Sequence, residues 1–298
     1  MLPVSVLLAL VAPVLGGPIK LSARDLTFGV QSCSAANEAQ YFSCQAPGSV
    51  SGNSCCYEND GLILQTQFWD FDLSLLSSVS SNEARKLLVK KRGNLVARAS
   101  SADNDVSQTF TIHGLWDDTC GGSYNQFCNP DWEFSDSDNI PDILSLFGQD
   151  DLLNTMQTYW ISNSGLPESL WEHEFNKHGT CFNTIAPSCF TGDYQQYQNA
   201  VAYFQKVVDV WNTLPTYSFL LAAGIEPSTD GQYALLDIQD TLSSNHGGKE
   251  VYIGCRNGAI SEVWYFHNVK GNILNGQLLP VDSVTLSKCP ENVWYLPK

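Results

Sequence analysis

A dense group of proton-carrying side chains lies in the run WEHEFNKHGTC at positions 171–181. The group consists of His173, Glu174, Lys177 and His178, in a chain with only 5 histidines among 298 residues. At about 100° per residue, these positions fall at roughly 0°, 100°, 40° and 140° around a helix and share one broad face. Imidazoles, a carboxylate and an ammonium on one face suit proton transfer beside a negatively charged reacting group. We expect Gly179 to end this helix.

A zinc protease helix is the nearest alternative for this segment. Its H-E-x-x-H motif places two histidines four residues apart, so that both reach one metal ion. His173 and His178 are five residues apart, which turns the second imidazole about 140° from the first. We therefore expect no metal ion and no cofactor. The remaining alternative is a solvated helix face that happens to carry histidine.

A second candidate lies in the run FTIHGLWDD at 110–118, where alternation of side chains predicts a strand. His113 would face the side opposite Phe110. A single histidine on a strand is more often structural than catalytic. A purely structural role is disfavoured here, because Trp116 and Asp118 follow His113 closely and a histidine-rich helix is predicted elsewhere in the chain.

Other elements must hold these two segments in place. The sequence predicts strands at 61–69, 250–255 and 260–267, and helices within 141–160, 192–211 and 215–223. An Asn257-Gly258 turn should join the last two strands. The helix at 192–211 is the clearest, because its apolar residues recur at spacings of three and four and form a core stripe. Of the remaining histidines, His267 is expected to be structural and His246 to lie on the surface.

Cysteine content and the amino-terminal run indicate a secreted protein. Residues 1–17 are apolar, end in small residues and are too short to span a bilayer, so they predict a signal peptide. No later stretch predicts a membrane span. The 10 cysteines imply up to five disulfides, and the adjacent Cys55 and Cys56 need different partners. We expect one domain over 18–298, either extracellular or delivered to a vacuole or lysosome.

The net charge of −16 argues against a broad positively charged surface that would attract a polyanion such as nucleic acid. Nucleic acid would have to bind at a local cationic site, and acidic pH would weaken the repulsion. Residues 70–109 are exceptional because they hold six of the 15 lysines and arginines between serine-rich flanks. We interpret this segment as a flexible surface insertion. Processing at Lys91-Arg92, RNA contact and a gene-model error remain alternatives.

Together, FTIHGLWDD and WEHEFNKHGTC resemble the two active-site segments of the ribonuclease T2 family. LQTQFWD at 64–70, TYWISN at 158–163 and the adjacent Cys55 and Cys56 support this resemblance, which covers most of residues 30–298. It implies an α+β fold in which an antiparallel sheet packs with helices and is tied by disulfides. Fungal-type members imply the pairs Cys33–Cys56, Cys44–Cys120, Cys55–Cys189, Cys128–Cys181 and Cys255–Cys289.

The resemblance also implies a metal-independent endoribonuclease that acts on single-stranded RNA. Attack by the 2′-OH would give a 2′,3′-cyclic phosphate and then a 3′-phosphate, with an acidic pH optimum, whereas DNA lacks this nucleophile. The implied roles are His178 as base, His113 as acid, His173 at the phosphate, and Glu174 and Lys177 as groups that stabilise the transition state. We expect a monomer that needs no partner besides its RNA substrate.

Base binding in the family implies stacking by Trp116 and Tyr124 and a base-edge acceptor at Asp118. Little base specificity is expected, with a purine amino group, adenine above all, favoured at Asp118. Asp117 departs from the family, which usually has proline there, and is expected to add negative charge near the phosphate. The segment that matches the second base site, at 161–163 and Leu170, also departs from the usual pattern.

Two other classes of protein remain as alternatives. A binding or signalling protein on the same scaffold would be marked by loss of a catalytic histidine, and no such loss is seen. A secreted hydrolase with a carboxylate pair would leave the clustering of histidines unexplained. The sequence therefore favours the ribonuclease.

Overall fold

The computed structural model describes residues 28–33, 40–46, 55–76, 79, 106–162 and 165–298. The predicted signal peptide and most of the basic insertion, residues 80–105, lie outside the described residues. Among the described helices, none is long and apolar enough to cross a lipid bilayer.

The fold is α+β, as predicted, and is organised around a five-stranded antiparallel sheet with the order β2-β1-β5-β4. The short β6 pairs with the second half of β5. The strands are β1 (Leu62–Phe68), β2 (Thr111–Asp118), β4 (Tyr252–Arg256), β5 (Ala259–Lys270) and β6 (Gln277–Pro280). A separate two-stranded sheet joins β3 (Tyr233–Ala234) to β7 (Asn292–Val293). The predicted Asn257-Gly258 turn connects β4 and β5, with both residues at positive φ.

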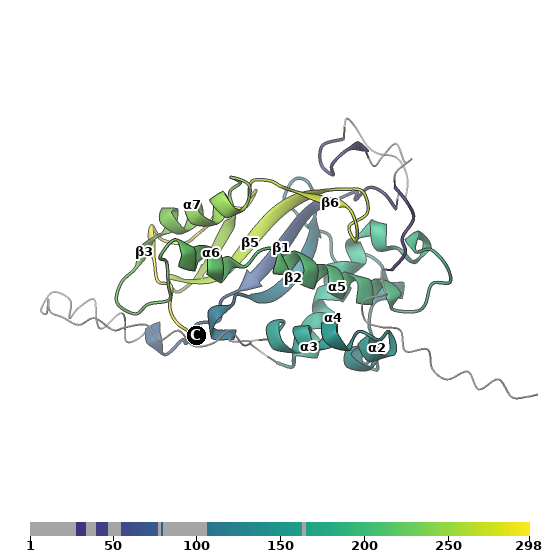
Figure 1. The fold of residues 1–298 in the computed structure, drawn as a ribbon, viewed down its shortest axis with the longest axis horizontal. Helices are drawn as coiled ribbons and strands as arrows, with labels where there is room; N and C mark the ends of the chain where they lie inside the picture. The colour runs from purple at the N-terminus through teal and green to yellow at the C-terminus, as the bar shows by residue number, and fades with distance from the viewer. Residues whose placement is uncertain (1–27, 34–39, 47–54, 77–78, 80–105, 163–164) are drawn as a thin grey trace, which may run out of the picture.

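Helices cover one face of the large sheet and one of its ends (Figure 1). Figure 1 shows α5, α6 and α7 along one face, whereas α2, α3 and α4 gather at the end nearest β2. The helices are α2 (Ile140–Leu146), α3 (Asp150–Tyr159), α4 (Pro167–Lys177), α5 (Gln198–Asn212), α6 (Thr216–Ala222) and α7 (Leu235–Asn245). Short 3₁₀ helices occupy Val106–Gln108, Pro130–Trp132, Gly179–Cys181, Asn183–Ile185 and Pro187–Cys189.

The predicted core helix is α5. Its stripe residues Val201, Phe204 and Val208 are buried, which confirms that the stripe is core. Periodicity misplaced the start of this helix, because Tyr197 has a φ of 66° and directly precedes it. Similarly, the single helix predicted within 141–160 is two helices, α2 and α3, separated where Gly148 adopts a φ of 69°.

The prediction that His246 lies on the surface is wrong. Its side chain is buried, with Nε2 2.9 Å from the carbonyl oxygen of Phe266 and its ring 4.8 Å from that of His267. His246 is buried because it ends α7, which packs it against β5. This helix was not predicted from the sequence. His267, which was predicted to be structural, is buried, and burial lowers its pKa to about 3.

Five disulfides hold the loops around this framework. They pair Cys33–Cys56, Cys44–Cys120, Cys55–Cys189, Cys128–Cys181 and Cys255–Cys289, the same five pairs that the resemblance implies. Cys181 ends the 3₁₀ helix that follows α4, so its bond to Cys128 ties this end of the histidine-rich segment to the loop after β2.

Candidate active site

The two candidate segments, 110–118 and 171–181, meet where α4 packs beside β2. Trp171 of α4 donates its indole N–H to the carbonyl oxygen of Trp160 at 2.8 Å, and Trp160 in turn donates to that of His113 at 2.8 Å. These buried tryptophans therefore fix α4, the end of α3 and β2 relative to one another. The helix ends at Lys177, with His178 as its capping residue, rather than at Gly179.

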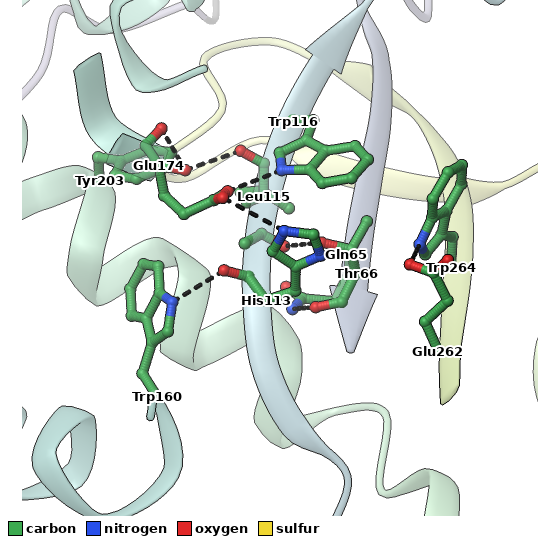
Figure 2. A network of polar contacts seen from close by, with 11 residues as sticks. Gln65, Thr66, His113, Leu115, Trp116, Trp160, Glu174, Tyr203, Glu262 and Trp264 are labelled. Atoms are coloured by element: carbon green, nitrogen blue, oxygen red, sulfur yellow. Dashed lines mark hydrogen bonds and ion pairs between the residues drawn. The ribbon is translucent and has the colours of Figure 1, made fainter. Parts of the chain in front are cut away.

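Glu174 is the centre of the cluster (Figure 2). Its carboxylate is fully buried, with Oε1 3.4 Å from His113 Nε2 and Oε2 accepting a hydrogen bond from Trp116 Nε1 at 2.8 Å. Burial opposes ionisation, but His113, His178 and Trp116 together hold the pKa of this carboxyl below its ordinary value. Glu174 is therefore an anion that directly contacts one of the two proposed proton-transfer groups.

His178 is a buried imidazole that stacks on Trp116. The ring centroids are 4.7 Å apart with an interplanar angle of 18°, and only 4% of the residue's surface is exposed. Burial lowers the pKa of His178 to about 3, and Lys177 and the other site histidines act in the same direction against Glu174. Well above pH 3 this histidine is therefore mostly neutral, the form that a general base requires.

His113, on β2, has a different environment from His178. Its ring stacks on Phe68 at 3.9 Å and meets Trp116 edge-on at 5.0 Å. The Oε1 atom of Glu174 lies 3.4 Å from its Nε2, which places a carboxylate directly beside this ring. Both histidines therefore contact Trp116. His113 lies beside the Glu174 carboxylate, whereas His178 is buried against the Trp116 ring.

The remaining predicted residues surround this pair. Lys177 is half-buried, with Nζ 5.5 Å from the centroid of the exposed Tyr124 ring. His173 is exposed at the edge of the cluster. Asp118 forms a backbone bridge with Tyr124 and is nearly buried, and burial together with Asp60 raises its pKa to about 7. At acidic pH, the Asp118 carboxyl is neutral and can donate a hydrogen bond to a base edge as well as accept one.

Four supporting residues had no assigned role in the sequence analysis. They are Phe68, Gly114, Trp160 and Tyr203. Phe68 and Trp160 lie within LQTQFWD and TYWISN, so the resemblance could have marked them. Tyr203 lies beside the apolar stripe, yet its buried hydroxyl donates to the carbonyl oxygen of Leu115 at 2.9 Å and lies 3.3 Å from that of Glu174.

The expectation that Asp117 adds charge near the phosphate is wrong. Strand alternation turns its side chain away from the Trp116 face, and Oδ1 accepts a hydrogen bond from the backbone N–H of Gly61 at 2.6 Å. Burial raises the pKa of Asp117 well above its ordinary value, and Glu58 adds to this effect. The carboxyl is therefore a neutral, buried group at acidic pH.

Replacement of Asp117 by asparagine should change how stability depends on pH. A raised folded-state pKa means that the neutral form stabilises the fold in acid and that this contribution is lost as pH rises through that pKa. We expect Asp117→Asn to melt above the wild type at pH 8, with the difference shrinking toward zero by pH 4. Thermal melts from pH 4 to 8 measure it, with the exposed Asp193→Asn as matched control. A difference that is constant with pH would contradict the buried-acid interpretation.

Comparison with known proteins bears on the chemistry of this cluster. The family model described as "Ribonuclease T2 family" matches residues 61–282. The chain belongs to the ribonuclease T2 family. It is 40% identical over 259 residues to "Ribonuclease T2" of Aspergillus oryzae, covering 86% of this chain and 82% of the relative. It is 41% identical over 251 residues to "Ribonuclease Trv" of Hypocrea rufa, covering 84% and 93%.

Solved structures give the same result. The crystal structure of Actibind, described as a T2 ribonuclease, matches with a TM-score of 0.73 and 38% identity over 90% of this chain and 99% of that one. A more distant structure, RNase NT in complex with 5′-AMP, has 21% identity and a TM-score of 0.51 and shows the shared fold alone. Membership of the ribonuclease T2 family makes this protein an endoribonuclease that acts on RNA.

Proposed function

We propose that this ribonuclease T2 protein is a secreted, monomeric, metal-independent endoribonuclease that cleaves single-stranded RNA at acidic pH. The observation that carries the mechanism is the pairing of a buried, neutral His178 with a His113 that contacts the anionic Glu174. One histidine is prepared to accept a proton and the other to carry one. DNA is not a substrate, because the reaction needs the 2′-OH.

In the proposed first step, His178 removes the proton of the 2′-OH, whose oxygen attacks the adjacent phosphorus. The bond from phosphorus to the 5′-oxygen breaks, and His113 gives its proton to that leaving oxygen. The products are a 2′,3′-cyclic phosphate and a free 5′-OH. In the slower second step the roles reverse, because His113 activates water and His178 protonates the 2′-oxygen to leave a 3′-phosphate.

Lys177, His173 and Glu174 stabilise the crowded phosphorane-like transition state in this mechanism. Lys177 supplies positive charge at the end of α4, and His173 holds the phosphate from the exposed edge. Glu174 orients His113 through their contact. Trp116 and Tyr124 offer rings for the attacking nucleotide's base, and stacking of this kind is sequence-tolerant.

The reaction itself can be tested with matched RNA and DNA strands at pH 5 in EDTA. We expect the RNA to be cut to fragments with 2′,3′-cyclic phosphate ends, detected by mass spectrometry, while the DNA stays intact. EDTA should leave the rate unchanged. Uncut RNA would favour a binding or signalling role for this scaffold, and inhibition by EDTA would contradict the metal-independent mechanism.

The pH profile tests the proposed division of proton work. Because burial lowers the pKa of His178 to about 3, its base form persists throughout the acidic range. We expect kcat/KM to be bell-shaped, with an ascending limb that begins near pH 3, because the reaction needs a proton acceptor and a proton donor at once. Rates on a dinucleoside phosphate from pH 2.5 to 9 measure it. A rate that rises steadily to pH 9 would contradict these assignments.

A further inference from the structure

A row of aromatic rings leads away from the active site across the outer face of the sheet. His178 stacks on Trp116, and the Trp116 ring meets that of Trp264 edge-on at 5.2 Å. Trp264 on β5 in turn lies 4.2 Å from the ring of Tyr252 on β4, at an interplanar angle of 33°. Figure 2 shows Trp116 between Glu174 and Trp264. The proposed mechanism uses only the first part of this row.

The register of the sheet places the whole row on the catalytic face. Trp264 pairs with Tyr252 on one side and with Thr66 on the other, and Thr66 pairs with Gly114. Cross-strand partners share a face, and the carboxylate of Glu174 lies directly over Gly114. The outer rings are therefore on the same surface as the reacting groups.

These rings remain partly accessible although their neighbours are buried. Leu62, Leu64 and Phe266 form a small buried cluster on this same face. Trp264 and Tyr252 pack against that cluster but stay half-buried. Packing thus fixes the two rings in place and leaves part of each surface free, which is the property of a base-stacking platform.

A polar group accompanies the rings. Glu262 Oε2 accepts a hydrogen bond from Trp264 Nε1 at 3.0 Å. Gly254, its cross-strand partner, makes this placement possible, because a Cβ at Gly254 would lie 2.6 Å from Glu262 Oε1. A carboxylate next to a stacking surface repels phosphate but accepts hydrogen bonds from the exocyclic amino groups of cytosine and adenine.

We propose that Trp264, Tyr252 and Glu262 form an additional base-binding site, which takes the RNA nucleotide on the 5′ side of the one whose 2′-OH attacks. This proposal rests on the proposed function, in which Trp116 stacks on the base of the attacking nucleotide. Trp264 lies on the side of Trp116 away from Glu174, within reach of the nucleotide next to the one stacked on Trp116, and we assign that neighbour to the 5′ side. The site prefers a base that carries an amino group.

Oligonucleotides with one ribonucleotide among deoxynucleotides test this site, because each has a single cleavable bond. The substrates are rA-dA, the 5′-extended dC-dC-rA-dA and the 3′-extended rA-dA-dC-dC. For the wild type we expect the 5′ extension to raise kcat/KM by about tenfold, within the range that one stacked base provides. Trp264→Leu should reduce that gain to less than about twofold, whereas Trp264→Phe, which keeps a ring, should retain most of it.

Controls separate loss of stacking from loss of folding. The gain is a ratio within one enzyme, so a general loss of active protein cancels. The matched control is Trp132→Leu, at a half-buried tryptophan in the 3₁₀ helix Pro130–Trp132, which should keep the full gain. If Trp264→Leu does not fold, Tyr252→Leu serves as the second test variant. Replacing the added dC residues by dT should weaken the gain in the wild type but not in Glu262→Gln.

An unchanged gain in both Trp264→Leu and Tyr252→Leu would overturn the proposal. A gain from the 3′ extension that depends on Trp264 would overturn the assigned direction. Failure of the wild type to cut any of the three substrates would instead contradict the proposed function.

Discussion

Replacing His178 by alanine is expected to lower kcat/KM by about 10²- to 10⁴-fold, the contribution of a positioned general base. No other imidazole can take over its role, because His113 is in contact with Glu174 and His173 is exposed at the edge of the cluster. His178→Phe should lose as much activity, since it keeps an aromatic ring against Trp116 but has no nitrogen. Steady-state rates on a dinucleoside phosphate, together with melting curves, measure both variants.

A substrate with a 4-nitrophenolate leaving group distinguishes the base from the acid. Uridine 3′-(4-nitrophenyl phosphate) needs no proton on its leaving oxygen, so His113→Ala should be largely rescued on it. His178→Ala should not be rescued, because the 2′-OH must still lose its proton. Rescue of His178→Ala rather than His113→Ala would mean that the two proposed roles are exchanged.

Residue patterns predicted most of this architecture. The predicted strands occur because alternating side chains at 61–69 and 110–118 have one face in the core and the other toward the site. The α5 stripe was readable because its apolar residues face the core at helical spacing. By contrast, α7 buries only Ile238 and Leu242, so its periodic signal was too weak to reveal it.

Long-range contacts account for what the sequence could not predict. His246 looked exposed in its glycine-rich turn, but the packing of α7 brings it against β5. Asp117 looked like a charge near the phosphate, but strand alternation and the N–H of Gly61 hold it on the opposite face. In both cases the burial of a polar side chain depends on a partner distant in the chain, which local spacing does not encode.

The substitution Gly114→Ala is expected to cause the second large loss of activity, because the Glu174 carboxylate lies over Gly114. A Cβ there would be 1.9 Å from Glu174 Oε2 and 3.0 Å from Trp116 Nε1. Both oxygens of Glu174 already have close partners in His113 and Trp116, and the group is fully buried, so it has no free space to move into. Gly114→Ala should therefore displace the carboxylate and lower kcat about 10²-fold, the cost of a displacement near 1 Å in an active site.

The matched control for Gly114→Ala is Gly121→Ala, in the loop that follows β2. A Cβ at Gly121 would have one neighbour, Thr119 Oγ1, at 4.0 Å, so this variant should keep the wild-type rate. A double-mutant cycle shows whether the collision with Glu174 is the cause. Glu174→Asp shortens that side chain by one methylene, so Gly114→Ala should cost far less in this background than in the wild type. Equal costs in both backgrounds would mean that the loss does not come from the collision with Glu174. A fully active Gly114→Ala would mean that catalysis does not depend on the position of this carboxylate.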